Sequence, residues 1–267
     1  MTKYIDPYAA IEKTPLYAHD GMRSNGYSVR VQGQDDEGMP EWEEAGIVSS
    51  GYLLAPNLEV RNAQDALIER LPFKFEEKKV YYDGRHFMRT VVSTDGRLSR
   101  EIRKGDMVNL GIVAHNTYDG THAASLSLFV SHLVCLNGMV SRKYFLNYRF
   151  RHTQQFVDWP LEVEAAFKIL SADTLENTIE NFARRLTTLT TKVVSPDALR
   201  LARQDKLKHY SEAQWGGVVD QFLKQQDYTE MGLLDACTYK HWHSKSWANI
   251  AQTANIVDSF IPIGNEA

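Results

Sequence analysis

The 267-residue sequence has only two cysteines and lacks a long apolar segment. Cys135 and Cys237 are far apart and form no Cys-x-x-Cys pair, so neither a zinc spacing nor a disulfide framework is indicated. Two buried thiols are the expectation. No apolar run approaches the length that crosses a bilayer, and the first residues, MTKYIDPYAA, lack the apolar stretch of a secretory signal. The sequence therefore predicts a cytosolic protein without a membrane span.

The common sequence signatures of enzymes are also missing. There is no G-x-x-x-x-G-K-[ST], G-x-G-x-x-G, G-x-S-x-G or H-E-x-x-H, so nucleotide hydrolysis, dinucleotide binding, acyl transfer and zinc proteolysis have no motif to support them. We therefore predict no catalytic residue and no cofactor. A hydrolase whose carboxylates are dispersed over several strands, such as Asp83, Asp106 and Asp119, stays open as an alternative.

Histidines are the remaining candidates for metal ligands. His115, His122 and His132 lie with Cys135 in one predicted hairpin, and His241 and His243 flank a tryptophan. A first-row metal needs three or four ligands that converge at fixed distances, and these spacings permit such a site without requiring it. We expect structural or surface histidines and no bound metal.

Positive charge is unevenly placed along the chain. The net charge of −4 is unlike that of a protein whose whole surface holds a polyanion, so any contact with nucleic acid has to be local. Basic residues gather between positions 74 and 104: Lys74, Lys78, Lys79, Arg85, Arg89, Arg97, Arg100, Arg103 and Lys104. An acidic block, QDDEGMPEWEE, precedes them and is expected to be a solvated loop.

The middle of the sequence predicts an antiparallel sheet. Asp83-Gly84, Asp95-Gly96, Asp119-Gly120 and Asn137-Gly138 are pairs that tolerate the positive φ of tight hairpin turns. Strand-like runs lie between them: KVYY, RHFMRTVVS, DMVNLGIVAHN and AASLSLFVSHLVCL. Together with residues 139–156 they predict an antiparallel meander of at least four strands.

Helical periodicity begins after Trp159-Pro160. Leu175, Ile179, Phe182, Leu186 and Leu189 recur at spacings of three and four, which predicts a helix to about Lys192 with one buried stripe. Further helices are expected over residues 197–210, 211–226 and 228–246. The fold class is therefore α+β: a β-rich portion, residues 1–160, and a helical portion, residues 161–267, whose helices cover the antiparallel meander as part of one compact unit.

The segment MVSRKYFLNYRFRHTQQF, residues 139–156, which we call the basic ribbon, alternates between two chemistries. Tyr144, Leu146, Tyr148 and Phe150 share one parity, and Lys143, Asn147, Arg149 and Arg151 share the other, as expected of a strand. Lys and Arg suit phosphates and aromatic rings suit unstacked bases. The run RHFMRTVV repeats the theme with Arg85, Phe87 and Arg89. A sheet with one solvated face produces the same pattern without any ligand, so both interpretations stay open.

Four stretches in order are similar to a phage/plasmid-like family classed as a domain of unknown function: GIVSSGYLLAPNLEVRNAQDALIE, HNTYDGTHAA leading to SHLVCLNGMV, YRFRHT, and LLDACTYKHWH. The resemblance runs from about Gly46 to His243. The chain differs from the family in Leu136, where Thr is common, and in Cys237 beside the late Thr238. The resemblance implies a setting in mobile DNA, with replication, recombination or counter-defence rather than metabolism. The order of a meander and a long helix also resembles the core of phage single-strand annealing proteins.

The first hypothesis is a phage or plasmid protein in the cytoplasm of a bacterial host that binds single-stranded nucleic acid, as in annealing during recombination. The predicted contact residues are Arg85, Arg89, Arg142, Lys143, Tyr144, Phe145, Arg149 and Arg151. The basic residues would contact phosphate, and Tyr144 or Phe145 would stack a base. The alternative is a non-enzymatic counter-defence or regulatory protein that binds a host protein through its acidic block. Self-association into a homo-oligomer is compatible with either, and no membrane partner is expected.

Overall fold

The computed structural model describes residues 6–17, 21–35, 37–132, 137–139, 147–153, 170–205, 207–208, 210–242 and 247–261. The chain divides into two compact units. Unit 1 comprises Met1–Val91, Ile112–Ser127 and Asn147–Ser171, and unit 2 comprises Val92–Gly111, Leu128–Leu146 and Ala172–Ala267. The units therefore alternate along the chain, which differs from the expected single unit with a sequential division at residue 160. The reason is that the boundaries fall inside long strands.

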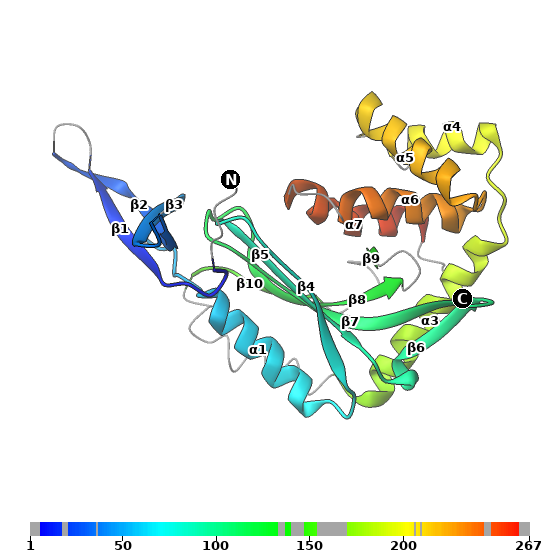
Figure 1. Cartoon of the computed structure of the whole chain (residues 1–267), viewed down its shortest axis with the longest axis horizontal. Coiled ribbons are helices and arrows are strands. Elements are labelled where there is room, and N and C mark those ends of the chain that lie inside the picture. Colours follow the sequence, from blue (N-terminus) through cyan, green and yellow to red (C-terminus); the bar gives the residue numbers. More distant parts are fainter. Residues whose placement is uncertain are drawn as a thin grey trace. The chain divides into compact units, whose positions relative to one another are not determined.

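A three-stranded antiparallel sheet opens unit 1 (Figure 1). Its order is β1-β2-β3, with β1 at Ile11–Tyr17, β2 at Arg23–Gln34 and β3 at Pro40–Ser49. Val29, Val31, Ala45 and Val48 form its buried side together with Tyr52 and Tyr118. The acidic block was expected to be a loop, and this is wrong for residues 40–44, which are strand and pair with β2.

The second sheet is an antiparallel meander, as the sequence predicted. Its order is β10-β8-β7-β5-β4, with β4 at Phe75–Tyr82, β5 at His86–Ser93, β7 at Asp106–Thr117, β8 at Ala124–His132 and β10 at Asn147–Phe150. Strands β5, β7 and β8 each continue from one unit into the other. In unit 2, β6 (Ser99–Arg103) pairs with β7 and β9 (Asn137–Met139) pairs with β8. The α+β class is confirmed.

Turn residues explain where these strands reverse. Gly84 and Gly120 have φ of 87° and 74°, which confirms the hairpin turns predicted at Asp83-Gly84 and Asp119-Gly120. Two other predicted turns are wrong. Asn137 and Gly138 lie in β9, where Asn137 pairs with His132. Asp95 instead caps a 3₁₀ turn, Gly96–Leu98, by accepting the Arg97 N–H.

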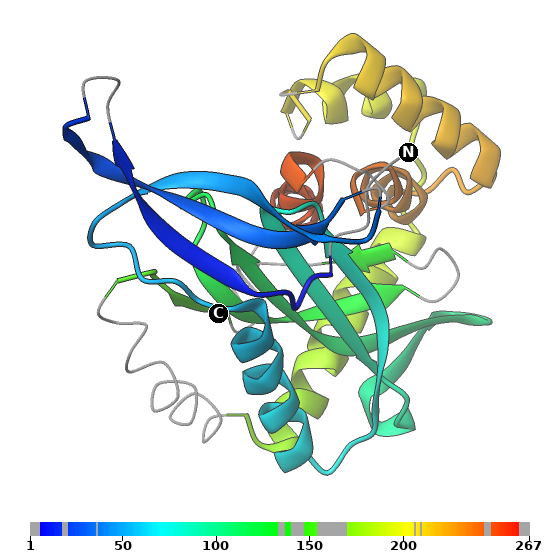
Figure 2. The ribbon, with the colours of Figure 1, turned by 60° about the vertical axis from the view of Figure 1, so that its left-hand side comes forward.

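Helix α1, Asn57–Arg70, had not been predicted. Its buried residues Val60, Gln64 and Leu67 recur at spacings of four and three, which is the helical period. Val60 packs in one cluster with Phe87 and Phe150 of the sheet, and α1 lies along these strands (Figure 2). One face of the sheet in unit 1 is therefore covered by a helix that precedes it in the chain.

The helices of unit 2 confirm most of the C-terminal prediction. They are α3 at Ala172–Thr190, α4 at Pro196–Asp205, α5 at Glu212–Gln225, α6 at Glu230–Trp242 and α7 at Trp247–Phe260. The five residues of the predicted stripe on α3 are all buried; α3 contacts β6, and α6 contacts β9. Cys237 of α6 is buried as expected, whereas Cys135 lies outside the described residues. None of the described helices is long and apolar enough to cross a bilayer.

The stripe on α3 gives a stability prediction. Phe182 is 2% exposed, so Phe182→Ala should lower the free energy of unfolding by about 3–5 kcal/mol through lost burial and a residual cavity. Asn177→Ala, at an exposed position of the same helix, is the control and should change it by less than about 0.5 kcal/mol. Chemical denaturation measures both, and equal midpoints for the two variants would contradict the assigned helix face.

Candidate functional site

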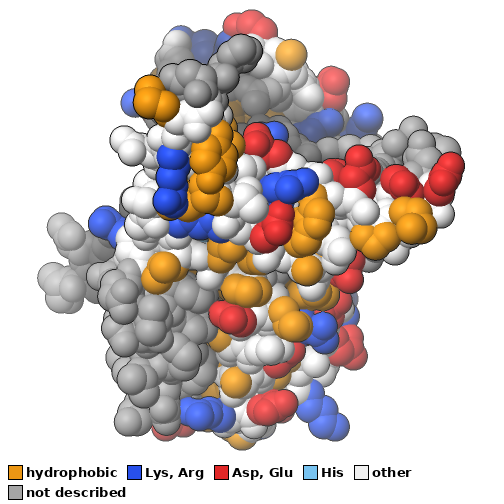
Figure 3. All heavy atoms as spheres, turned by 90° about the vertical axis from the view of Figure 1, so that its left-hand side faces the viewer, with side chains coloured by type: hydrophobic (Ala, Val, Ile, Leu, Met, Phe, Trp, Pro, Cys, Tyr) orange, Lys and Arg blue, Asp and Glu red, His pale blue; other side chains and the backbone are white. Residues whose placement is uncertain are grey.

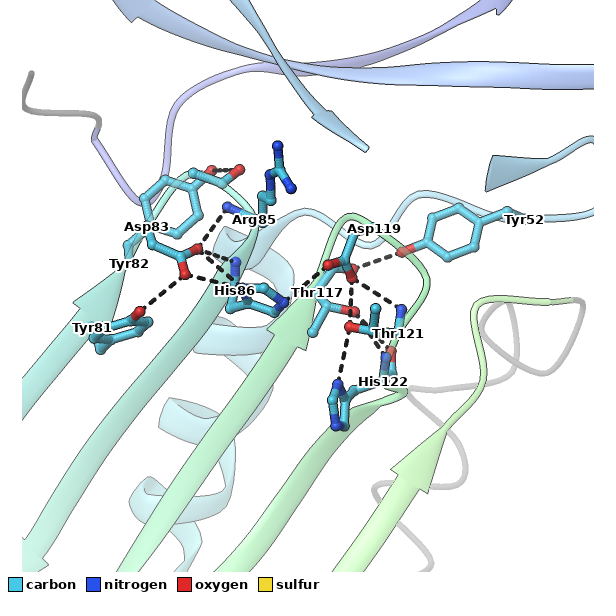
Figure 4. A network of polar contacts seen from close by, with 11 residues as sticks. Tyr52, Tyr81, Tyr82, Asp83, Arg85, His86, Thr117, Asp119, Thr121 and His122 are labelled. Carbon is cyan, nitrogen blue, oxygen red and sulfur yellow. Dashed lines mark hydrogen bonds and ion pairs between the residues drawn. The ribbon is translucent and has the colours of Figure 1, made fainter. Parts of the chain in front are cut away.

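Several loops of unit 1 meet at the same end of the strands of its meander. In an antiparallel sheet the end of one strand lies beside the start of its neighbour. The same end of this sheet therefore holds the β4–β5 turn, the β7–β8 turn and the residues after β10. The segment after β3 joins them, because Tyr52 donates its hydroxyl hydrogen bond to the Thr117 carbonyl at 2.6 Å. We call residues 49–52, 83–86, 118–123 and 149–153 together the loop end of unit 1 (Figure 4).

His86 joins the two hairpin turns at this edge. Its Nδ1 lies 3.0 Å from Asp83 Oδ2, and its Nε2 lies 3.0 Å from Asp119 Oδ2 (Figure 4). Asp83 Oδ1 accepts the backbone N–H groups of Arg85 at 2.9 Å and His86 at 2.7 Å. Asp119 Oδ1 accepts the N–H of Thr121 at 3.0 Å and its hydroxyl at 2.6 Å. Both carboxylates are therefore saturated by donors of their own turns and by the imidazole between them.

These contacts set the charge of the network. Burial alone would raise the pKa of Asp83, but the hydrogen bonds from His86 and Arg85 lower it to about 2. The pKa of Asp119 is lowered by the Thr121 hydrogen bonds against the opposing effect of burial. Burial disfavours a charged His86, but the two carboxylates outweigh this and raise its pKa. With both ring nitrogens engaged, His86 fixes the turns and has no free nitrogen to act as a general base.

Close packing places the β3–α1 connection against the same turns. Gly46 of β3 passes the β7–β8 turn so tightly that a Cβ there would lie 2.6 Å from the Asp119 Cα atom. Tyr52 stacks on His152 with ring centroids 4.5 Å apart. Burial lowers the pKa of His152 to about 4, so this imidazole is neutral at pH 7. A neutral, flat pair of rings therefore lies beside the charged network.

A pocket of about 430 Å³ opens next to these rings. Three segments line it: Ser49, Gly51 and Tyr52; Gly120, Thr121, His122 and Ala123; and Arg151, His152 and Thr153. All three belong to unit 1. Arg151, which sequence analysis assigned to phosphate contact, is therefore a wall of the pocket.

Three of the predicted contact residues share this edge and face solvent. Arg85, Arg149 and Arg151 are exposed, and the Arg85 guanidinium points away from the His86 network (Figure 4). Within the part of the chain that the structure describes, no carboxylate forms an ion pair with any of the three. Their charges are therefore available to a ligand.

Arg89 corrects the prediction. Its guanidinium is buried and contacts Glu77 and Asp65, each at 2.6 Å, and it donates to Gln64 Oε1 at 3.0 Å. Arg89 shares the strand parity of Phe87, and that face lies under α1, so it cannot be the solvated face. Arg89 is consequently part of the core and unavailable to phosphate.

The rest of the basic ribbon is only partly described. Phe150 is buried and Tyr148 is half-buried against the same cluster, so the aromatic parity is the packed one. Arg149 lies on the opposite parity and pairs in register with Ser125. Arg142, Lys143, Tyr144 and Phe145 lie outside the described residues, and their role stays a prediction.

The dispersed carboxylates do not form one site. Asp83 and Asp119 share His86, but Asp106 lies in unit 2, where it contacts His132 and accepts from Arg103 Nε at 2.7 Å. His132 also contacts Asp235 at 2.8 Å, and burial raises the pKa of that carboxyl. Across the described ranges, no group of three or more His, Cys, Asp or Glu side chains is arranged to hold a metal ion.

Sequence analysis did not identify His86, Tyr52 or His152 as site residues. One signal was available for the first, because both hairpin turns carry the pattern Asp-Gly-x-His, DGRH at 83–86 and DGTH at 119–122. Tyr52 and His152 had no comparable signal. They stack across about a hundred intervening residues, which only the tertiary fold brings together.

Charge elsewhere on the surface is mixed. On the face drawn in Figure 3, Lys and Arg side chains are separated from one another by acidic, apolar and uncharged side chains. This agrees with the net charge of −4, which requires any anion-binding surface to be local.

Comparison with known proteins gives one finding. A family model described as "Domain of unknown function (DUF932)" matches residues 44–232, which is more than two thirds of the chain. Neither the curated proteins nor the solved structures yield a match. The matched range includes every residue of the loop end.

The His86 network gives a pH prediction. A raised folded-state pKa means that the contribution of His86 to stability is complete below its ordinary value of 6.5 and is lost as the pH rises through the folded-state value. The His86 ring resonance, followed by NMR, should therefore titrate above 6.5, and Asp119→Asn should lower its midpoint. Asp83 affects stability at low pH. Its contribution to stability is present above about pH 3.9 and is lost as the pH falls toward 2. A wild-type His86 midpoint at or below 6.5 would contradict this charge assignment.

Arg89 gives a separate stability prediction. Arg89→Ala should lower the free energy of unfolding by about 2–3 kcal/mol, because it leaves two carboxylates without their partner. The loss is smaller than for a fully buried pair, since Asp65 and Glu77 are partly exposed. Arg85→Ala is the matched control and should change the stability by less than about 0.5 kcal/mol. Similar urea midpoints for both variants would show that Arg89 does not support the core.

Proposed function

This chain belongs to the family of the domain of unknown function DUF932, and we propose that it binds single-stranded nucleic acid at the loop end of unit 1. One observation carries the proposal. Arg85 comes from one segment and Arg149 and Arg151 from another far along the chain, yet all three are exposed at the same end of one sheet without ion pairs to described carboxylates. Unpaired guanidinium groups gathered in this way are suited to phosphate oxygens.

Strand order gives the spacing of these arginines. Arg85 precedes β5, and Arg149 and Arg151 lie at the end of β10, with β7 and β8 between them. Three interstrand steps of about 4.8 Å place the two sides about 14 Å apart across the sheet. A flexible nucleic-acid strand that crosses the β7–β8 turn can therefore contact Arg85 and the Arg149–Arg151 pair with phosphates a few nucleotides apart. A stiff duplex follows such a short, curved edge less readily.

Electrostatics supports a contact of limited size. Asp83 and Asp119 carry negative charge at the loop end, and Arg85 lies beside them, as does His86, whose pKa they raise. Arg149 and Arg151 are the described cations of the loop end that lie outside this network. Binding should consequently be modest and sensitive to salt, because it depends on the release of few counterions.

The biological setting belongs to the same proposal. The resemblance to a phage/plasmid-like family favours a role in recombination, with annealing of single strands as the concrete form, in the cytoplasm of a bacterial host. Copies of the chain along one strand would give a homo-oligomer, as expected for cooperative binding of single strands.

A second candidate function rests on the β2–β3 hairpin. Met39 at its tip is 61% exposed and is flanked by Glu37 and Glu41, both exposed. An apolar side chain in an acidic surround suits a basic partner protein, such as a host factor that the chain would inhibit or regulate. A pull-down from host lysate with the wild type and with Met39→Lys separates this candidate from the first. A stoichiometric, nuclease-resistant partner that is lost in Met39→Lys would favour it.

The main prediction concerns salt dependence. Arg149→Ala combined with Arg151→Ala should weaken binding of a labelled single-stranded oligonucleotide whatever its sequence, and leave the melting temperature nearly unchanged. The slope of log K against log salt should become shallower by roughly 0.7 for each lost phosphate contact. Fluorescence anisotropy over a salt series measures both quantities.

The control removes equal charge elsewhere. Arg184 and Arg200 are exposed on helices of unit 2, so Arg184→Ala combined with Arg200→Ala changes the net charge by the same amount. This control should keep the wild-type slope. An unchanged slope in the folded Arg149/Arg151 variant, or an equal change in the control, would contradict the proposed interface.

A further inference from the structure

The pocket at the loop end has the lining of an oxyanion site. Arg151 supplies a guanidinium, and Ser49, Thr121 and Thr153 supply hydroxyl groups. Among the described residues that line it there is no carboxylate. Cations and hydroxyl donors without a competing carboxylate are the donor set that phosphate oxygens require.

The nearest acid is already engaged. Asp119 directly precedes the lining residue Gly120, and its Oδ1 accepts from Thr121 while its Oδ2 contacts His86 (Figure 4). The Thr121 hydroxyl is committed to this bond, so Ser49 and Thr153 are the hydroxyl donors left for a ligand. Arg151 has no described carboxylate partner that a ligand would have to displace.

The aromatic residues that line the pocket have a different chemistry. Tyr52 and His152 are largely buried and stack on each other with an interplanar angle of 14°, and His152 is neutral because burial lowers its pKa to about 4. A neutral aromatic pair beside a guanidinium group fits a ligand that joins a phosphate to a flat, uncharged ring. A nucleotide has this composition.

The positions of the arginines suit different parts of a nucleic-acid strand, its end and its interior. Arg85 and Arg149 do not line the pocket and remain available to internal phosphates, whereas Arg151 does line it. A terminal phosphate monoester carries about −1.5 to −2 charges at pH 7, compared with −1 for an internal diester. The terminal monoester is therefore attracted more strongly than an internal diester to a pocket that contains a guanidinium group.

We propose that this pocket binds the terminal phosphate monoester of a nucleic-acid strand, with Arg151, Ser49 and Thr153 on the phosphate and the terminal nucleoside over the Tyr52–His152 pair. The inference rests on the proposed function, which supplies the strand. It assigns the chain a recognition of strand ends in addition to sequence-independent contact along the strand.

The test compares three oligonucleotides of one sequence by fluorescence anisotropy: one with a 5′-phosphate, one with a 3′-phosphate, and one with neither. One phosphorylated end should bind about tenfold more tightly than the unphosphorylated strand. Arg151→Ala should abolish this difference. Arg149→Ala should weaken all three while keeping the difference, since Arg149 lies outside the pocket.

A second variant tests the space itself. Gly51 lines the pocket, its φ is not positive, and a Cβ there would meet no atom within 4 Å, so Gly51→Trp adds a large side chain at the recess without a clash at its Cβ. Gly96→Trp is the matched control, because Gly96 is equally open but lies in unit 2. Gly51→Trp should remove the preference for the phosphorylated end and Gly96→Trp should retain it.

The outcomes separate the two proposals. Equal binding of all three oligonucleotides, with the salt slope still dependent on Arg149 and Arg151, would overturn the terminal-phosphate pocket and leave strand binding standing. No binding of any of them at low salt would overturn both. Inorganic phosphate alone, added as a competitor, should erase the preference for the phosphorylated oligonucleotide while leaving strand binding in place, which would support the pocket. A preference that persists in a 100-fold excess of phosphate over oligonucleotide would count against it.

Discussion

The contacts of His86 with Asp83 and Asp119 are the interaction on which the loop end of unit 1 depends. They join the β4–β5 turn to the β7–β8 turn, and the second of these turns forms one wall of the pocket. Each turn reverses at a glycine with positive φ, and each carries the carboxylate that holds the imidazole. Local turn chemistry therefore positions the network. The network joins the two turns in addition to the backbone hydrogen bond from the Tyr118 N–H to the Arg85 carbonyl at 2.8 Å.

Burial decides which charges of the sheet are structural and which are available to a ligand. Arg89 and Asp106 lie in strands and are buried, and each contacts a group of opposite charge, since an isolated buried ion is too costly to retain. The buried His132 side chain contacts the carboxylates of Asp106 and Asp235. Arg149 lies in the same sheet and Arg85 in the turn before β5, and neither has such a partner among the described residues. The difference arises because α1 covers the face that carries Arg89 and α6 supplies Asp235 to His132, whereas Arg85 and Arg149 are exposed.

The fold could be predicted from sequence to a large extent because most of its signals are local. The strand-like runs RHFMRTVVS and DMVNLGIVAHN predicted β5 and β7, Asp-Gly pairs predicted two turns, and the stripe from Leu175 to Leu189 predicted α3. Helix α1 was missed, although Val60, Gln64 and Leu67 show its period, because polar residues dilute the apolar stripe. Asn137-Gly138 was misassigned because turn propensity is weaker than strand pairing, which places Asn137 opposite His132.

The sequence by itself determined the α+β class, the meander and the buried face of α3, since period and turn chemistry depend on neighbouring residues. Only the tertiary structure decided which basic residues are buried and which are exposed. Arg85 and Arg89 look alike in sequence, four positions apart on one parity, yet one is exposed at a turn and the other is enclosed by Asp65 and Glu77. The same holds for the pocket, whose walls come from three separate segments. Strand parity fixes which residues share a face, but whether a face meets solvent or a helix depends on long-range packing, and no local pattern encodes that.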